Sequence, residues 1–375
     1  MNHDHCMDDA IGLATKGRAW VSPNPMVGAV VVNNGAIVGR GWHKEFGGPH
    51  AEVFALQDAG ENARGGTLYC TLEPCNHTGK TPPCTQAVIR AGISRVVLGA
   101  RDPNPLASGG VDILRAAGIE VVTGIRDEAC RQLNAAFFKF HATKLPFISL
   151  KWAMTADGKI ATASGDSKWI SGEASRAFSH RLRASHDAVL VGINTLLADS
   201  ARLTARIPDA QAAVHQPRRV ILDSQARTPL DAPLFKESDG GPVVIVVKSS
   251  APAERVNALI AAGATILRID SSEARVPVRE ALAELAKIGV LSVLVEGGSS
   301  ILGSVLDARL ADRAYIFIAP RLIGGEDARS AVGGMGAARI SDGVELRAPS
   351  MRMLEKDVLL SGGLSDWEWR CPDVD

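Results

Sequence analysis

The chain has 375 residues, with 41 basic and 41 acidic side chains and a sequence pI near 7.1. This length predicts two domains, each large enough for its own hydrophobic core. Because the charge is balanced, the chain lacks the overall basic character of most nucleic-acid-binding proteins, and we expect no nucleic-acid partner.

The apolar segments, the N-terminus and the cysteines together predict a cytoplasmic protein. The longest apolar runs, among them residues 27–32 and 243–247, are far too short to cross a bilayer, so no membrane partner is expected. The first ten residues, MNHDHCMDDA, are polar and acidic and do not resemble a signal peptide. Six cysteines in a chain of this length, two of them in a metal-site pattern, are typical of a reducing compartment.

The first part of the chain alternates strand-like and helix-like segments, which predicts a layered α/β domain. Residues 33–35, Asn-Asn-Gly, separate two apolar runs and predict a β-hairpin, because Asn-Gly supplies the positive φ angles of a tight turn. The boundary falls at Leu145-Pro146, so we predict one domain over residues 1–145 and another over 146–375. Strands are expected at 27–32, 36–38, 67–71, 95–99 and 119–122, and helices at 51–59, 85–91, 113–117 and 137–144.

The second part predicts another α/β domain. Several of its expected strands are nearly continuous Val, Ile and Leu, which is typical of strands covered on both faces. Residues 280–287 predict an amphipathic helix, with Leu282, Leu285 and Ala286 on one face. The expected strands are residues 147–154, 188–191, 219–222, 243–247, 265–269, 290–295 and 314–318.

One histidine, two cysteines and one glutamate form the most informative pattern in the chain. His50 and Glu52 are separated by one residue, Cys75 follows a proline, and Cys84 comes nine residues later, at the start of a predicted helix. This order matches the H-x-E and P-C signature of zinc deaminases that act on amino-substituted heterocycles. One imidazole and two thiolates leave the fourth zinc position open to water, as in catalytic sites. We therefore predict zinc on the histidine and both cysteines, with Glu52 moving protons.

Other interpretations of the zinc pattern remain open from these residues alone. A structural zinc site, or a zinc-stabilised binding module, would keep the ligands without needing Glu52. A tRNA or nucleoside deaminase would share the motif, but the neutral charge and the second domain argue against it. His3, His5 and Cys6 are expected to belong to a frayed, solvated terminus rather than a second metal cluster.

The first domain also carries six short motifs around these residues. They are P-N-P at 23–25, V-G-A at 27–29, P-H-A-E at 49–52, L-E-P-C at 72–75, G-K-T-P-P-C at 79–84 and D-P-N-P at 102–105. In this order they resemble the deaminase half of the bifunctional riboflavin-biosynthesis deaminase/reductase family. The resemblance implies a cytidine-deaminase-like three-layer fold. It also implies that the substrate is bound by Asn24, His43, Lys80, Asp102 and Asn104.

The second domain offers a nucleotide-site signal of moderate strength. A predicted strand ends at Val295, and a turn with two glycines, residues 296–300, leads into a predicted helix, whose N-terminus favours negative charge. The chain has no G-x-G-x-x-G at this point, so a Rossmann dinucleotide site is not supported.

Motifs in the second domain are similar to the reductase half of the same family. They are K-W-A-M-T-A-D-G-K-I-A at 151–161, S-K-W-I at 167–170, V-G at 191–192, T-L-L-A-D at 195–199 and V-E-G-G at 295–298. The resemblance implies a dihydrofolate-reductase-like fold that uses NADPH. It implies a cofactor site lined by Ala153, Trp169, Thr195, Asp199, Ser224, Gly298, Ser299, Ser300, Ile301, Leu302, Gly303 and Ser304. The implied substrate residues are Lys151, Ser167, Arg183, Leu203, Arg206 and Glu296.

The resemblance implies two consecutive reactions on a phosphorylated pyrimidine. The first is zinc-dependent hydrolytic deamination of 2,5-diamino-6-ribosylamino-4(3H)-pyrimidinone 5′-phosphate. The second is NADPH-dependent reduction of the ribosyl moiety to give 5-amino-6-(5-phosphoribitylamino)uracil. The alternative is a zinc deaminase with an inactive second domain. A homo-oligomer is also expected from the family.

Overall fold

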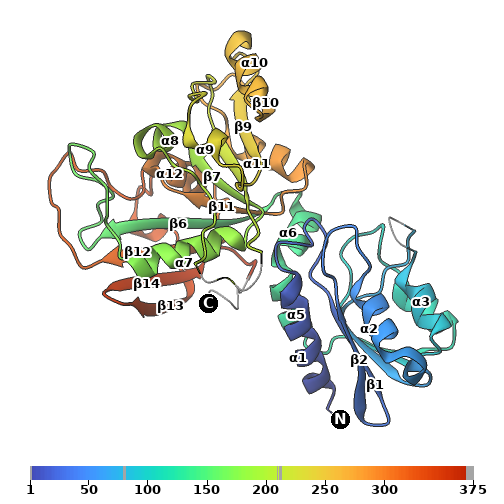
Figure 1. Ribbon diagram of the computed structural model, residues 1–375. Coiled ribbons are helices and arrows are strands. Elements are labelled where there is room, and N and C mark those ends of the chain that lie inside the picture. The colour runs from blue at the N-terminus through green and yellow to red at the C-terminus, as the bar shows by residue number, and fades with distance from the viewer. Residues whose placement is uncertain (1, 79–81, 209, 211–212, 369–375) are drawn as a thin grey trace. The chain divides into compact units, whose positions relative to one another are not determined.

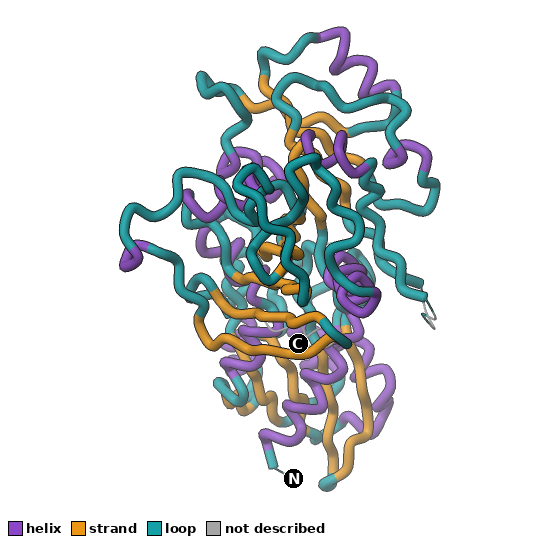
Figure 2. The backbone as a smooth tube through the Cα atoms, turned by 90° about the vertical axis from the view of Figure 1, so that its left-hand side faces the viewer, coloured by secondary structure: helices purple, strands orange, loops and turns teal. Residues whose placement is uncertain are grey.

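The computed structural model describes residues 2–78, 82–208, 210 and 213–368, which form two compact units (Figure 1). The first unit extends to Lys144, and the second begins at Leu145 and continues to Glu368. Both units contain strands and helices, which are orange and purple in Figure 2. Within the described ranges, every helix is too short or too polar to span a bilayer.

The first unit is built on a five-stranded sheet with the order β2-β1-β3-β4-β5. The predicted hairpin is confirmed: β1 pairs antiparallel with β2, and Asn34 and Gly35 have φ angles of 49° and 76° in the turn. β1 is also antiparallel to β3, whereas β3, β4 and β5 are parallel. The strands are β1 (Gly28–Asn33), β2 (Ala36–Trp42), β3 (Thr67–Leu72), β4 (Arg95–Ala100) and β5 (Glu120–Val122).

Helices cover both faces of this sheet, which confirms the predicted three layers. α2 (Ala51–Ala59), α3 (Cys84–Arg90) and α4 (Gly110–Ala116) share one apolar core with the strands. α1 (His3–Ala14) and α5 (Asp127–Leu133) contact the sheet from its other side. α6 (Ala135–Thr143) follows α5, and short 3₁₀ turns occupy Thr15–Gly17 and Gly60–Ala63.

The expectation of a frayed, solvated N-terminus is wrong. The Asn2 side chain accepts a hydrogen bond from the backbone of Asp4 and caps α1, which satisfies a free N–H of its first turn. Cys6 and Met7 are fully buried, and Nδ1 of His3 lies 2.9 Å from the hydroxyl oxygen of Tyr69 on β3. The apolar face of α1 therefore anchors this segment to the sheet.

Glycines on β2 let α2 approach the sheet closely. A Cβ atom placed on Gly41 would lie 2.3 Å from the carbonyl oxygen of Ala51, and one on Gly39 would lie 2.2 Å from that of Ala55. Only glycine fits such contacts without displacing backbone. They set the position of the N-terminus of α2, where His50 and Glu52 are located.

The Gly41→Ala substitution should destabilise the first unit by about 2 kcal/mol or more, because the added methyl group collides with the backbone of α2. Gly12→Ala is the matched control, since Gly12 is exposed on α1 and has no atom within 4 Å of its Cβ position. The control should stabilise the helix by about 0.5–1 kcal/mol. Urea unfolding measures the free energy of unfolding of both variants. Equal values for the two would contradict the close approach of α2 to β2.

The second unit contains a nine-stranded sheet with the order β10-β9-β8-β7-β11-β6-β12-β14-β13. The seven strands from β10 to β12 are parallel, and β14 and β13 add an antiparallel hairpin at one edge. The strands are β6 (Phe147–Thr155), β7 (Ala188–Gly192), β8 (Arg218–Leu222), β9 (Val243–Lys248), β10 (Thr265–Ile269), β11 (Ser292–Glu296), β12 (Arg313–Ala319), β13 (Arg347–Leu354) and β14 (Asp357–Gly363).

Six α-helices accompany this sheet in the described residues. The predicted amphipathic helix is confirmed as α11, whose Leu282 and Leu285 are fully buried in a core shared with β6 to β9 and β11. The helices are α7 (Glu173–Ala184), α8 (Ile193–Asp199), α9 (Pro233–Lys236), α10 (Ala253–Ala261), α11 (Val278–Lys287) and α12 (Ser299–Asp307), with a 3₁₀ turn at Ile340–Asp342.

Candidate active sites

The predicted zinc residues come together in the first unit. His50 precedes α2 as its N-cap, Cys75 lies just beyond β3, and Cys84 begins α3. The Nδ1 atom of His50 lies 3.5 Å from Sγ of Cys75 and 3.3 Å from Sγ of Cys84. The three ligand atoms all lie within 4.8 Å of one another, and both cysteines are buried.

These distances fit a shared zinc ion. Tetrahedral zinc with ordinary Zn–N and Zn–S bonds would separate a nitrogen and a sulfur ligand by about 3.6 Å. A hydrogen bond from the Cys84 thiol, helped by His50, lowers the pKa of the Cys75 thiol, and the same contact raises the pKa of Cys84. Zinc would replace this shared proton and hold both sulfurs as thiolates.

Glu52 lies in the first turn of α2, beside the three ligands. Its side chain is only 3% exposed, and its Oε2 atom has no hydrogen-bond partner among the described residues. Burial raises the pKa of this carboxyl above its usual value. A buried carboxyl with a free oxygen and a raised pKa is suited to taking up and releasing a proton.

His43 and Asn24 form a second polar group of this site. Nδ1 of His43 lies 3.0 Å from the carbonyl oxygen of Pro49, which can only accept, so Nδ1 carries the proton. Nε2 therefore accepts from the amide nitrogen of Asn24 at 3.1 Å. Burial lowers the pKa of His43, and its ring meets His50 edge-on, with centroids 5.2 Å apart. The neutral imidazole thus holds the Asn24 amide in one orientation.

Asp102 and Asn104 form a turn after β4. The Asp102 carboxylate accepts a hydrogen bond from the backbone of Asn104, and the Asn104 side chain accepts one from Leu106. Burial raises the pKa of Asp102 to about 6. Lys80, the remaining predicted substrate residue of this unit, lies outside the described residues.

Glu73 supports the candidate site from behind and was not singled out from the sequence. Its buried carboxylate accepts hydrogen bonds from Nε of Arg101 and from the backbone nitrogens of Asp102, Gly109 and Val111. These bonds tie the turn after β4 and the start of α4 to the segment that leads to Cys75. An acidic residue directly before Pro-Cys at the end of an apolar strand was the available signal.

The predicted cofactor residues gather where parallel strands end. β8, β7, β11 and β6 are neighbours and run in the same direction, so their carboxyl ends meet at one edge of the sheet. Thr195 follows β7, Ser224 follows β8, and Gly298 follows β11 and precedes α12. A Cβ atom on Gly298 would lie only 2.7 Å from Oγ1 of Thr195, which shows how closely these loops approach. Nucleotides bind open parallel sheets at this edge.

The remaining cofactor predictions differ in accessibility. Leu302 is fully buried in the apolar core, and Gly303 is buried against the backbone of Gly333, so neither residue is exposed to a ligand. Trp169 is 63% exposed and stacks on the guanidinium of Arg176 at 4.7 Å. Ala153, Asp199, Ser299 and Ile301 are half-buried, and Ser300 and Ser304 are exposed.

Three predicted substrate residues form a buried ion cluster. Arg183 of α7 donates two hydrogen bonds to Glu296 at the end of β11, at 2.6 and 2.8 Å, and Nζ of Lys151 lies 3.7 Å from the same carboxylate. Burial alone would raise the pKa of Glu296, but the two cations outweigh it and lower the pKa to about 2. Glu296 is therefore ionised and fixes Arg183.

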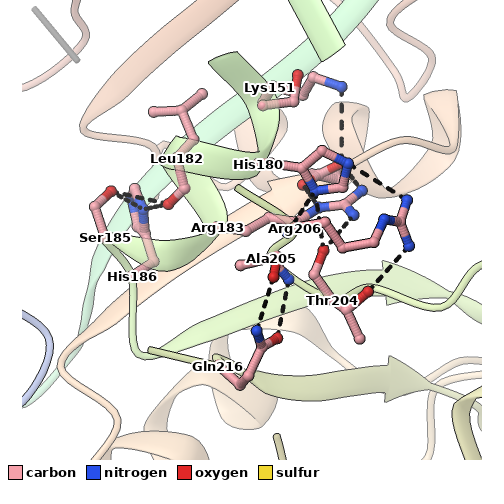
Figure 3. A network of polar contacts seen from close by, with 12 residues as sticks. Lys151, His180, Leu182, Arg183, Ser185, His186, Thr204, Ala205, Arg206 and Gln216 are labelled. Atoms are coloured by element: carbon pink, nitrogen blue, oxygen red, sulfur yellow. Dashed lines mark hydrogen bonds and ion pairs between the residues drawn. The ribbon is translucent and has the colours of Figure 1, made fainter. Parts of the chain in front are cut away.

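Arg206 completes this cluster together with His180 and Thr204 (Figure 3). Nη1 of Arg206 donates to the hydroxyl of Thr204 at 3.1 Å, and the Thr204 carbonyl accepts from Nη1 of Arg183 at 3.0 Å. Ser167 is half-buried and Leu203 is buried, and neither takes part in the polar contacts of the cluster in the described residues. His180 was not predicted, because a histidine in a polar helix carries no distinctive sequence signal.

Asp357 is a second residue that only the fold reveals. Its fully buried carboxylate accepts hydrogen bonds from the backbone of Gly172 and the hydroxyl of Ser175, both at 2.6 Å. Gly172 is the N-cap residue of α7, so the β13–β14 hairpin caps the helix that carries His180 and Arg183.

Fold and sites together define a zinc-dependent deaminase joined to a reductase. A cytidine and deoxycytidylate deaminase zinc-binding region matches residues 1–100, and a RibD C-terminal domain matches residues 146–360. The chain is 42% identical over 355 residues to riboflavin biosynthesis protein RibD of Actinobacillus pleuropneumoniae, covering 94% of this chain and 93% of the relative. It is 43% identical over 357 residues to RibD of Aquifex aeolicus, covering 94% and 95%.

Solved structures agree over both units. Acinetobacter baumannii RibD, in its form 2, superposes with a TM-score of 0.87 at 36% identity, covering 97% of this chain and 99% of that one. The diaminohydroxyphosphoribosylaminopyrimidine deaminase/5-amino-6-(5-phosphoribosylamino)uracil reductase of Thermotoga maritima gives 0.83 at 36% identity, with the same coverage.

The chain belongs to the RibD family of riboflavin biosynthesis proteins. It is a bifunctional enzyme, with a zinc deaminase and an NADPH-dependent reductase on one chain. The reductase match is continuous over residues 146–360 and gives no support to the alternative of an inactive second domain.

Glu296→Gln should lower the free energy of unfolding of the second unit by about 3 kcal/mol at neutral pH, because it removes the charge that Arg183 and Lys151 share. The pKa of Glu296 is lowered from 4.5 to about 2 by folding. The contribution of the Glu296 charge to the free energy of unfolding is therefore fully present above about pH 4.5 and is lost as the pH falls towards 2.

Denaturant unfolding of the wild type and the variant at several pH values measures this contribution. The difference in free energy of unfolding between the wild type and Glu296→Gln should be constant near neutral pH and should narrow only at acidic pH. Glu284→Gln, which breaks the more exposed pair with Lys287, is the control and should cost less than about 0.5 kcal/mol. A difference in free energy of unfolding that grows as the pH falls would contradict the assigned charge of Glu296.

Proposed function

We propose that residues 1–145 catalyse the deamination of 2,5-diamino-6-ribosylamino-4(3H)-pyrimidinone 5′-phosphate, with His50, Cys75 and Cys84 as zinc ligands. Residues 146–375 then reduce the ribosyl group of the product with NADPH to give 5-amino-6-(5-phosphoribitylamino)uracil. The observation that carries the proposal is the cluster of three ligand atoms within 4.8 Å beside the unpartnered oxygen of Glu52.

In the deaminase, Glu52 is the proposed catalytic residue. Zinc held by His50, Cys75 and Cys84 would supply a bound water of lowered pKa. Glu52 would take up one proton of this water on a carboxyl whose pKa burial has raised and deliver it to the ring nitrogen. It would then carry the second proton of the same water to the amine, which departs as ammonia. Because its Oε2 atom makes no hydrogen bond within the described part of the chain, this oxygen is available to the reacting groups.

Substrate recognition in the deaminase is assigned to groups around this carboxyl. Asn24, whose amide is oriented by His43, offers a carbonyl oxygen to a pyrimidine N–H or amino group. Asp102 and Asn104 lie in the turn held by Glu73, and we assign them to the ribose. Lys80 is assigned to the phosphate on the motif resemblance alone.

In the reductase, NADPH is proposed to lie along the carboxyl edge formed by β8, β7, β11 and β6. The N-terminus of α12 and the glycines before it offer backbone N–H groups and a favourable dipole to the cofactor phosphates. Thr195 and Ser224 border the same edge. The proposed lining comprises Ala153, Trp169, Thr195, Asp199, Ser224, Gly298, Ser299, Ser300, Ile301, Leu302, Gly303 and Ser304, of which Leu302 and Gly303 are buried behind the others.

The substrate phosphate of the reductase is assigned to Arg206. Lys151 and Arg183 share one carboxylate, that of Glu296, so the cluster of three cations carries a positive excess that suits a phosphate dianion. Within the described residues Arg206 forms no ion pair, and it is exposed, so its guanidinium fork is the group most available to a ligand. We assign the orienting role to Arg183 and Glu296, and further substrate contacts to Ser167 and Leu203.

We also propose a cytoplasmic enzyme that associates with itself. Cys6, Cys70, Cys75, Cys84 and Cys130 are all free and buried, as expected in a reducing compartment. β13 is the last strand of the nine-stranded sheet, and nearly all its residues are exposed. Met351 and Met353 on this edge are 77% and 61% exposed. An exposed strand edge with apolar side chains is a template for pairing, and we assign it to a second copy of the chain.

Glu52→Gln should lower the kcat of deamination about 10³-fold, because the amide cannot carry the proton between water and substrate. Zinc content and NADPH-dependent reduction of the deaminated substrate should stay at wild-type levels. Ammonia release, metal analysis and NADPH oxidation measure the three quantities. The control Glu61→Gln changes an exposed glutamate after α2 and should leave all three unchanged. Full deaminase activity in Glu52→Gln would remove Glu52 from the mechanism.

Replacing Met351 and Met353 together with lysine should shift the protein from an oligomer to the 39.5 kDa monomer, because charge on the strand edge opposes pairing. Met335→Lys is the control, since Met335 is 91% exposed and lies in a loop outside β13. Light scattering after gel filtration gives the masses. A wild type that is already monomeric, or a double variant that stays oligomeric, would contradict the assigned interface.

A further inference from the structure

His180 lies between the two arginines of the reductase cluster. It shares a face of α7 with Arg183, three residues further along the helix. Its Nδ1 atom is 3.1 Å from the carbonyl oxygen of Thr204, and its Nε2 atom is 3.4 Å from Nη2 of Arg206 (Figure 3). The imidazole thus bridges the helix and the segment that carries the proposed phosphate-binding arginine.

The contacts of His180 define its tautomer. The Thr204 carbonyl can only accept, so a hydrogen bond to it places the proton on Nδ1. Nε2 then has a lone pair that faces the guanidinium of Arg206 and accepts from it. In the opposite tautomer, Nδ1 would accept from the backbone nitrogen of Arg206 at 3.2 Å, but an N–H at Nε2 would face another N–H donor. The first arrangement satisfies both ring nitrogens.

The surroundings keep the imidazole neutral. Burial, followed by the charges of Arg183 and Arg206, lowers the pKa of His180 to about 4, although Glu296 opposes this shift. A protonated ring would lose the lone pair at Nε2 and would repel both guanidinium groups. A neutral ring is therefore able to accept from Arg206 throughout the physiological range.

We propose that His180 is a positioning residue of the reductase, which holds Arg206 by a hydrogen bond to Nε2 and thereby sets the preference for a 5′-phosphorylated substrate. The hydroxyl of Thr204 holds the other terminal nitrogen of the same guanidinium. With two of its nitrogens anchored, Arg206 loses little further side-chain freedom when a phosphate binds. The proposal rests on the proposed role of Arg206 in binding the substrate phosphate.

A double-mutant cycle on the full-length enzyme tests this inference. The variants are Arg206→Met, His180→Leu, both together, and His180→Gln, whose amide oxygen can take the place of the Nε2 acceptor. The reductase kcat/KM is measured with 5-amino-6-(5-phosphoribosylamino)uracil and with the same compound lacking its phosphate. The ratio of the two values is the phosphate preference. Deaminase activity and the KM for NADPH report on folding.

Arg206→Met should lower the phosphate preference at least about 30-fold. His180→Leu should lower it about tenfold, through a raised KM for the phosphorylated substrate, while turnover of the phosphate-free compound changes little. His180→Gln should recover most of this loss. In the Arg206→Met background, His180→Leu should have no further effect, because the residue it positions is gone.

The outcomes separate the two proposals. An unchanged preference in Arg206→Met would contradict the phosphate role of Arg206 itself. A reduced preference in Arg206→Met together with additive effects of His180→Leu would overturn only the positioning role of His180. Equal losses on both substrates in His180→Leu would likewise overturn it, since a general structural defect does not depend on the phosphate.

Discussion

A strand that is covered on both faces can carry a charged side chain only where a partner compensates its charge, and this constraint helps to locate both active sites. Buried charge is costly unless it is paired, so ionisable groups collect where the strands end. In the first unit Cys75 follows β3 and Asp102 follows β4. In the second, β11 is buried throughout and its only charged residue, Glu296, is its last. Parallel strands bring such ends together at one edge, which is why residues far apart in the sequence converge there.

The same constraint explains how polar groups support the two centres. Glu73 is buried at the end of β3, where four donors from the turn after β4 and from α4 satisfy its carboxylate. Glu296 is buried at the end of β11, where Arg183 and Lys151 form ion pairs with its carboxylate. In both units a buried carboxylate therefore organises the neighbouring loops. The groups assigned to chemistry differ: a carboxyl of raised pKa at Glu52, and cations around a neutral imidazole in the reductase.

Much of the fold follows from local pattern, and the failures have physical reasons. α2 was predicted with its observed bounds, and the hairpin was recognised because Asn34-Gly35 has few alternatives to a tight turn. α7 was missed because its twelve residues include only two large apolar side chains that are buried, Phe178 and Leu182. β13 was missed because its exposed positions give no core-facing alternation. The zinc site could be predicted because its sequence motif is short. The role of His180 could not be predicted, because it depends on contacts with Thr204 and Arg206, which only the folded chain brings next to α7.

The central claim is that two independent centres lie on one chain, and that the zinc site serves only the first reaction. The most direct test is to measure ammonia release and NADPH oxidation separately on one preparation, before zinc removal, after it, and after zinc is restored. Each activity is assayed with its own added substrate, so that the reductase measurement does not depend on product from the deaminase. We expect ammonia release to disappear with zinc and to return with it, while NADPH oxidation stays constant. Ammonia release that persists without zinc, or NADPH oxidation that falls with it, would contradict this account.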